Sequence, residues 1–210
     1  MTGSSKYALP SAKSLEIAIN KQQNKQTKEV PGDIALWFFL LAELAVFGIL
    51  ILGFALTRKT QPEMFLSGLN QLHLSSGIIN TLALLTGSFF AALGVKKVRQ
   101  QHPKSYYYFI AAAISGCFYL IIKAVEYIDL YSLGYSLHTN TFFSFYFFTT
   151  FFHYLHALAG ILILLIVANW LRSTKESTEK RTRAAECIAS YWHTVDLIWI
   201  VLLPTLYLLK

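Results

Sequence analysis

The chain has 210 residues, of which 55% are hydrophobic and only 14% are charged. Soluble domains carry about 25% charged residues, so this composition excludes an ordinary soluble domain and, equally, a disordered chain. Two cysteines are too few for a disulfide scaffold. The net charge of +7 is spread between apolar runs, which argues for membrane topology and against a nucleic-acid-binding face. The sequence therefore predicts an integral membrane protein.

Residues 1–30 differ from the rest of the chain. They are polar and rich in Lys and Gln, and they lack the apolar core of a signal peptide. We interpret them as a flexible basic tail on the cytoplasmic side. Pro31-Gly32 then breaks the chain before the first apolar run. This divides the sequence into the tail, 1–30, and a membrane domain, 31–210.

Five apolar stretches follow within 31–210. Each is long enough to cross the membrane, which takes roughly 20 mostly apolar residues for about 30 Å of hydrocarbon. The predicted spans are 33–56, 71–95, 106–131, 141–171 and 187–209. The expected fold is an all-α bundle of five transmembrane helices.

The basic residues indicate the direction of the chain, because cytoplasmic loops carry an excess of Lys and Arg. Fourteen of them lie in the tail, the 96–105 loop and the 172–186 loop, all on one side of the predicted membrane. The other side holds only Arg58, Lys59 and Lys210. We therefore expect the N-terminus in the cytoplasm and the C-terminus outside, in a multi-pass protein of the bacterial inner (cytoplasmic) membrane.

Seven of the ionisable side chains inside the predicted spans are the most informative: Glu43, Lys123, Glu126, His153, His156, His193 and Asp196. A charge at the bilayer centre costs about 2.5–3.5 kcal/mol on insertion scales, so these groups are expected to face the bundle interior and to pair. Apart from Glu43 they form three couples, Lys123 with Glu126, His153 with His156 and His193 with Asp196. The members of each couple are three positions apart, so each couple shares a helix face.

Counting about 1.5 Å per residue gives each group a depth. Glu43 falls at the level of His193 and Asp196 in the inner half, and the other four form a second layer nearer the outside. One interpretation is that these polar networks fix the positions of the helices. The other is a proton-linked or lipid-binding role, for which Glu43 is the main candidate because it has no cation on its own helix.

No motif in the sequence indicates an active site. The histidines of 141–171 and His193 differ in depth by roughly 13–18 Å, which excludes a bis-histidine haem, and four metal ligands of suitable type are not in view. HExxH, phosphate-binding and Ser/His/Asp patterns are missing from the sequence. We expect no catalytic residue, metal or cofactor in this chain.

The aromatic run TFFSFYFFTTFFHY (141–154) is the other conspicuous feature of the spans. Aromatic side chains are favoured at the membrane interface, so we interpret the run as packing and lipid contact near the outer surface, with a quinone pocket as the weaker alternative.

Four stretches resemble a known family: PGDIALWFFLLAELAVFG (31–48), KAVEYIDLY (123–131), TFFHYLHALAG (150–160) and ECIASYWHTVDLIWIVL (186–202). The last is the most specific, because it joins a Tyr-Trp-His-x-x-Asp block to an upstream Glu. Together they resemble subunit III of the haem–copper oxidases (cytochrome c oxidase subunit III) in its short, five-helix form. The segment NTLALLTGSFFAALGV (80–95) is most similar to the subunit-III-like proteins of bacterial nitric oxide reductases.

The resemblance implies that this chain binds no haem or copper, packs against a catalytic subunit I and its other subunits, and holds phospholipid between helices. The haem, with copper or non-haem iron, would belong to that catalytic subunit. Glu43 matches the family's carbodiimide-reactive carboxylate, which is linked to lipid head groups and proton uptake. Structural or interface roles are implied for the other signature positions, Glu126, His153, His156, Glu186, His193 and Asp196. Lys123 joins the same polar networks but is not diagnostic.

The expected function is that of a non-catalytic accessory subunit of a respiratory oxidase or nitric oxide reductase. It would stabilise the catalytic subunit and its lipid and support proton uptake. The alternative is a small proton-coupled membrane transporter, against which the lack of a visible internal repeat counts. The sequence leaves open both the acceptor, oxygen or nitric oxide, and the donor, cytochrome c or quinol.

Overall fold

The computed structural model describes residues 34–174 and 176–208, and all regular elements in these ranges are helical. The basic tail predicted at 1–30 lies outside the described residues. In chain order the elements are α2 (Ile34–Thr60), α3 (Pro62–Leu69), α4 (Leu74–Arg99), α5 (Tyr106–Ser132), α6 (Thr141–Ser173), α7 (Thr178–Leu203) and the π-helical turn η1 (Pro204–Leu208).

Five of these helices, α2 and α4 to α7, are long and apolar enough to cross a membrane. This confirms the prediction of an all-α protein with five spans. Many large apolar side chains point outward, most clearly on α2, where Ile34, Phe38 and Ile49 are 73%, 71% and 70% exposed. Water would penalise such a surface, whereas lipid tails are as apolar as these side chains.

Most span ends agree with the prediction to within a few residues, and two features differ more clearly. The last span begins at Thr178 rather than 187, because hydropathy detects only the part of a helix in hydrocarbon, while the Glu-, Lys- and Ala-rich segment before it also favours helix. The short helix α3 lies in what was expected to be a connection. Pro62 stands in its first turn, a position that suits proline, and Phe65 is fully buried against the ring of Phe54.

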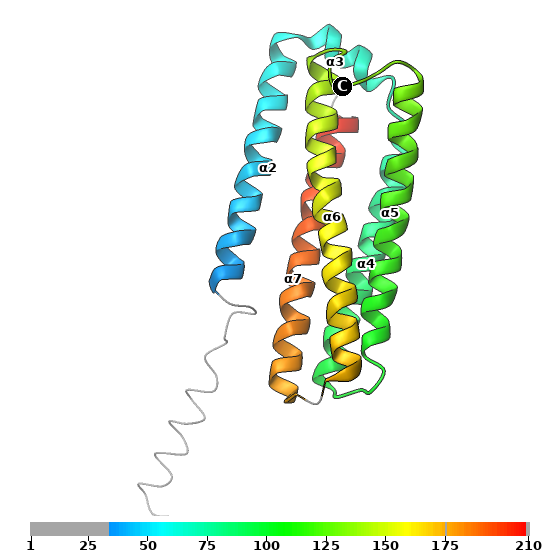
Figure 1. Cartoon of the computed structure of the whole chain (residues 1–210). Helices are drawn as coiled ribbons and strands as arrows, with labels where there is room; N and C mark the ends of the chain where they lie inside the picture. The colour runs from blue at the N-terminus through cyan, green and yellow to red at the C-terminus, as the bar shows by residue number, and fades with distance from the viewer. Residues whose placement is uncertain (1–33, 175, 209–210) are drawn as a thin grey trace, which may run out of the picture. The chain divides into compact units, whose positions relative to one another are not determined.

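Helices α4 to α7 form a four-helix bundle (Figure 1). All four helices meet around one central side chain. Trp192 of α7 is fully buried and faces a glycine on each of the other three helices. An added Cβ would lie 3.2 Å from its indole at Gly87 of α4, 2.6 Å at Gly116 of α5 and 3.0 Å at Gly160 of α6. Small residues of this kind let membrane helices approach closely, and here they accommodate one large ring.

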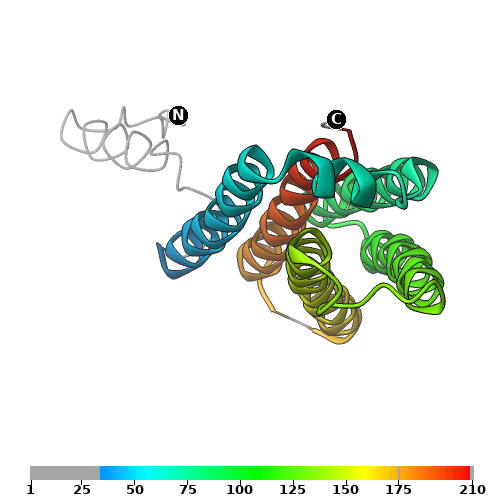
Figure 2. The same cartoon turned by 90° about the horizontal axis from the view of Figure 1, so that it is seen from above.

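Helix α2 packs on the side of this bundle, against α6 and α7 (Figure 2). Its contact face is a stripe of buried residues spaced by seven, Leu40, Phe47 and Phe54. Phe47 packs on α6, with its ring centroid 5.5 Å from that of Phe152 and 5.6 Å from that of His156. A narrow apolar seam thus attaches α2 to the other four spans.

The connection from α5 to α6 is well specified. Gly134 follows the end of α5 with a φ of +85°, a conformation that glycine adopts without strain. The bonds from Gly134 N–H to the Tyr131 carbonyl and from Tyr135 N–H to the Leu130 carbonyl complete a Schellman motif. Asn140 then caps α6 by accepting a hydrogen bond from the Phe143 N–H at 3.0 Å.

Candidate functional site

The interior of the bundle holds one compact charged cluster, Lys123 and Glu126 of α5 with Tyr146 of α6 and Tyr207 of η1. The Lys123 Nζ donates to Glu126 Oε2 at 3.2 Å, to the Tyr146 hydroxyl at 2.9 Å and to the Tyr207 hydroxyl at 2.8 Å. Both tyrosine hydroxyls donate onward to Glu126 Oε1, at 2.8 Å and 2.6 Å. The ion pair expected from the three-residue spacing therefore forms, and two tyrosines complete it.

This cluster is buried, and its charges are balanced within it. Lys123 is 0% exposed and Glu126 4% exposed, and the ammonium also faces the rings of Tyr146 and Trp199, at 4.8 Å and 5.4 Å from their centroids. A buried ion pair repays its desolvation only when additional hydrogen bonds satisfy the remaining donors and acceptors. That condition is met here, so the cluster can link α5, α6 and the C-terminal turn.

His153 of α6 occupies a second buried position, at 0% exposure. Its Nδ1 lies 2.9 Å from the Tyr119 hydroxyl and its Nε2 lies 3.0 Å from the Val195 carbonyl. Both ring nitrogens are thus engaged, and the ring packs on Trp199 with centroids 5.2 Å apart. The imidazole connects α5, α6 and α7 and has no coordination site left for a ligand.

Glu43 and His156 meet between α2 and α6. Glu43 Oε2 lies 2.8 Å from His156 Nε2, and the two side chains are only 18% and 14% exposed. His156 Nδ1 bonds the Phe152 carbonyl of its own helix at 2.7 Å, which holds the imidazole toward Glu43. This contact joins α2 to the bundle through two titratable side chains.

His193 and Asp196 of α7 form a further group with Ser88 of α4. His193 Nδ1 lies 3.1 Å from the Ser88 hydroxyl, and the Asp196 carboxylate also lies beside Ser88 and His193. Asp196 is 4% exposed, yet its Oδ1 has no hydrogen-bond partner within the described part of the chain. His193 also lines a groove of about 270 Å³ between α2 and α7, with Trp37 on the opposite wall.

Glu186 lies apart from these interior groups, where the last turn of α4 meets the early part of α7. Its Oε1 accepts from Arg99 Nη2 at 2.6 Å and from Arg99 Nε at 2.9 Å. Both donors belong to the last turn of α4, so the ion pair ties the end of α4 to the early part of α7.

The two-layer arrangement expected from depth is wrong for His156. It places His156 in the outer layer, away from Glu43, whereas the His156 ring contacts the Glu43 carboxylate. The physical reason is the length of α6. With 33 residues, α6 is much longer than the roughly 20 that cross the hydrocarbon, so counting from Leu171 as the membrane surface places His156 too far out.

Tyr146 and Tyr207 were not singled out in the sequence, although both complete the Lys123–Glu126 cluster. A signal for Tyr146 does exist, because it lies seven residues before His153 and therefore on the same face of α6. Tyr207 follows Pro204 at the end of the last span and gives no comparable signal.

Within the described ranges, no three His, Cys, Asp or Glu side chains are close enough to share a metal ion.

Comparison with known proteins identifies the chain's relatives. The family profile of cytochrome c oxidase subunit III matches residues 34–210. Cytochrome c oxidase subunit 3 of Thermostichus vulcanus is 33% identical over 179 residues, which cover 84% of this chain and 86% of the relative. The chain belongs to the cytochrome c oxidase subunit III family. Its match starts at the first described residue and includes all five spans.

Further relatives are subunit 3 proteins of two kinds of oxidase, a ubiquinol oxidase and a cytochrome c oxidase. Cytochrome bo(3) ubiquinol oxidase subunit 3 of Buchnera aphidicola is 25% identical over 190 residues, or 90% of this chain and 92% of the relative. Cytochrome c oxidase subunit 3 of Synechocystis is 33% identical over 174 residues, covering 81% and 72%. Subunit III relatives thus occur in enzymes named for cytochrome c and for ubiquinol, so membership alone does not assign the electron donor.

Proposed function

We propose that this chain is a non-catalytic accessory subunit of a bacterial haem–copper oxidase, in which it packs against the catalytic subunit I in the inner membrane. The observation that carries the proposal is the family match over every described helix, together with bacterial relatives named as oxidase subunits. The haem and copper of such a complex lie in its catalytic subunit. The role of this chain is to stabilise that subunit and its lipid.

The packing supports a stabilising role. The Trp192–glycine contact and the closed Lys123–Glu126 cluster make α4 to α7 a well-packed scaffold. By contrast, α2 presents a broad apolar surface, which suits contact with lipid or with another membrane subunit. The proposed orientation, with the N-terminus in the cytoplasm, follows from the distribution of Lys and Arg.

We assign the proton-linked part of the proposal to Glu43. Its carboxylate is the one in α2 that contacts a titratable group of the bundle, and it lies at the edge of the bundle rather than in the closed cluster. A carboxylate–imidazole pair that is partly accessible can exchange a proton with a partner, which the fully bonded Glu126 cannot do without breaking its ion pair. The apolar groove between α2 and α7, lined by Trp37, Leu40 and Leu44 on α2, would hold the accompanying lipid chain.

The test is to remove this chain from the purified complex and to restore it. The proposal predicts that the depleted oxidase keeps its haem content, takes up protons and turns over more slowly, loses activity sooner during sustained turnover, and regains its rate and lifetime when the chain is added back. Loss of haem on depletion would instead give the chain a part in the cofactor site. An unchanged lifetime would contradict the stabilising role.

A nitric oxide reductase is the second candidate complex, favoured by one observation, the similarity of 80–95 to subunit-III-like proteins associated with those enzymes. In α4 this segment supplies Asn80, Ser88 and the contact glycine Gly87. The metal content of the co-purified catalytic subunit separates the candidates, because an oxidase contains copper where the nitric oxide reductase contains non-haem iron.

A further inference from the structure

Tyr119 of α5 and His153 of α6 form a hydrogen-bonded pair in the interior of the bundle. The Tyr119 hydroxyl lies 2.9 Å from His153 Nδ1, and both residues are 0% exposed. The two rings pack edge to face, with their centroids 5.5 Å apart. The pair thus places a phenol, which a one-electron oxidant can oxidise, in direct contact with an imidazole, which can act as a base.

The second contact of His153 gives the direction of this hydrogen bond. Its Nε2 lies 3.0 Å from the Val195 carbonyl, and a carbonyl oxygen can only accept. Nε2 therefore carries a proton, and in the neutral imidazole Nδ1 then has a lone pair. The Tyr119 O–H donates to that lone pair, over a distance within the range of about 2.6–3.2 Å that suits proton transfer between side chains.

We propose that Tyr119 is a one-electron redox site with His153 as its proton acceptor. A one-electron oxidant of high potential takes one electron from the phenol ring and is itself reduced by one electron. The Tyr119 O–H bond breaks and an N–H bond forms at His153 Nδ1, which leaves a neutral phenoxyl radical beside an imidazolium. Because the Val195 carbonyl opposite Nε2 takes up no proton, the transferred proton stays on His153. A one-electron reductant then reverses both transfers.

Trp199 of α7 packs on both rings of the pair, with its centroid 5.2 Å from that of Tyr119 and 5.2 Å from that of His153. Its indole N–H donates to the Thr81 hydroxyl at 3.0 Å, and a hydroxyl is a much weaker base than an imidazole. An oxidised Trp199 would therefore keep its proton and its positive charge. Electrons can pass through this ring, but the radical is more stable on Tyr119.

Tyr146 and Tyr207 are also buried tyrosines, but their hydroxyls have a different acceptor. Both donate to Glu126 Oε1, at 2.8 Å and 2.6 Å. Transfer of either proton would neutralise this carboxylate and leave the buried Lys123 ammonium without its counter-charge, which is unfavourable. Proton transfer from Tyr119 to His153 breaks no ion pair among the described residues.

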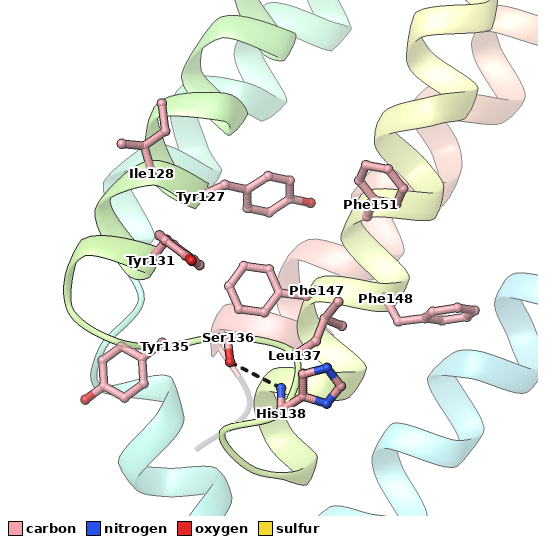
Figure 3. A pocket seen from close by; sticks show the side chains of 10 residues that line it. All are labelled: Tyr127, Ile128, Tyr131, Tyr135, Ser136, Leu137, His138, Phe147, Phe148 and Phe151. Carbon is pink, nitrogen blue, oxygen red and sulfur yellow. Dashed lines mark hydrogen bonds between the residues drawn. The ribbon is translucent and has the colours of Figure 1, made fainter.

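Three further tyrosines, Tyr127, Tyr131 and Tyr135, line an apolar groove of about 590 Å³ between α5 and α6 (Figure 3). The Tyr127 hydroxyl donates to the Thr150 hydroxyl at 2.8 Å, again a weak base, and Tyr131 is 75% exposed. A radical on an exposed ring reacts with its surroundings sooner than one on an enclosed ring. Among the tyrosines that the structure describes, Tyr119 therefore combines enclosure with a hydrogen bond to an imidazole.

The class of oxidant that Tyr119 meets in the cell rests on the proposed function. A haem centre that activates oxygen in a catalytic partner is a one-electron oxidant of high potential, and Tyr119 would hold an oxidising equivalent that leaves it. The redox site itself needs no partner. A photogenerated ruthenium(III) complex performs the same one-electron oxidation on the isolated chain, so failure of the redox site and failure of the oxidase proposal are distinguishable.

The test is flash oxidation of the full-length chain in detergent by photogenerated tris(bipyridine)ruthenium(III), followed by EPR of the trapped radical. Tyr119→Phe removes the phenol hydroxyl. Tyr146→Phe is the matched control, because both tyrosines are 0% exposed and each variant loses one buried hydroxyl. His153→Gln keeps a carbonyl acceptor for the Tyr119 hydroxyl but removes the base.

The proposal predicts a persistent neutral tyrosyl radical in the unmodified chain and in Tyr146→Phe, with about tenfold or greater loss in Tyr119→Phe and in His153→Gln. High-field EPR of the unmodified chain should also show one hydrogen bond to the phenoxyl oxygen, a readout that needs no variant. Equal signals from Tyr119→Phe and Tyr146→Phe would overturn the assignment. So would an undiminished signal in His153→Gln, a radical without that hydrogen bond, or no persistent tyrosyl radical in the unmodified chain.

Discussion

The polar residues of this protein fall into two kinds according to what surrounds them. Lys123 and Glu126 are enclosed, with their charges satisfied by each other and by two tyrosine hydroxyls. Glu43 and His156 are a simple pair at a helix–helix seam and retain some exposure. Substitution of Lys123 or Glu126 alone should therefore destabilise the protein, whereas removal of the charge of Glu43 should leave the packing intact.

The enclosed pair should therefore behave as a unit. Lys123→Met or Glu126→Gln alone leaves one buried group without its counter-charge, which costs about 3–5 kcal/mol. In the double variant neither charge remains, so the loss should be smaller than the sum of the two single losses, by about 0.5–3 kcal/mol. Reversible unfolding of the full chain in detergent measures all three. Additive losses would show that the two side chains do not act as a pair.

Glu43→Gln tests the proton-linked proposal. The amide has the size of the carboxylate and can still reach His156, so assembly and helix packing should be unchanged. Only a group that titrates is lost, and proton uptake and turnover of the complex should become several-fold slower. The control is Glu63→Gln, the same change at an exposed position on α3. If Glu43→Gln left uptake, turnover and active lifetime at the level of Glu63→Gln, the proton-linked role would be wrong.

At the residue scale, the charged residues of the spans were predictable from the sequence, but not all of their partners were. The spacing of Lys123 and Glu126 on one helix predicted their contact, because i, i+3 neighbours must lie close. The pairing of Glu43 with His156 depends on how two helices are offset along their axes, which no single-helix pattern contains. Tyr146 was interpreted as part of a packing and lipid-contact run, because aromatic residues on both faces of α6 obscured the one that faces the core.

At the scale of helices, the bundle is organised by close approach around Trp192. The spans were predictable because crossing the hydrocarbon takes about 20 mostly apolar residues in a row. A run of this length is visible in the sequence itself. Helix α3 and the early start of α7 were not predictable in this way, since neither segment is long and apolar. Their helicity follows from local signals and packing, such as Pro62 in the first turn of α3 and the burial of Phe65.

Two glycines distinguish packing from helix propensity. An added Cβ at Gly116 would lie 2.6 Å from the Trp192 ring, whereas at Gly48 nothing lies within 4 Å. Gly116→Ala should thus destabilise the protein by about 1–3 kcal/mol through overpacking. Gly48→Ala should be neutral or stabilise by up to about 1 kcal/mol through helix propensity. Unfolding of both variants in the same detergent provides the comparison, and equal effects would mean that the Trp192 contact does not limit packing.

At the largest scale, the described residues form a four-helix bundle with a fifth span attached along a narrow seam. Such a division suits an accessory subunit, because the bundle supplies stability and the remaining surface of α2 is available to lipid or to a partner. The subunit III family match extends over the bundle and α2 alike, so both parts belong to the family fold. The orientation proposed from Lys and Arg is a property of the whole molecule and can be tested directly.

Matched Lys→Cys changes test that orientation. In a chain whose native cysteines are replaced by serine, Lys104→Cys lies in the loop between α4 and α5 and Lys59→Cys in the last turn of α2, both exposed. A membrane-impermeant thiol reagent added to intact cells whose outer membrane is permeabilised should label Lys59→Cys only, and Lys104→Cys should react only after the inner membrane is opened. The reverse pattern would place the N-terminus outside.

The most direct test of the central proposal is to isolate the tagged chain from native membranes in mild detergent and to identify its stoichiometric partners by mass spectrometry and haem spectra. The accessory-subunit proposal predicts one haem–copper catalytic subunit per chain. A catalytic subunit with haem and non-haem iron would assign the chain to a nitric oxide reductase instead. Recovery of the chain alone, under conditions that keep another respiratory complex whole, would contradict the accessory-subunit proposal and favour the transporter.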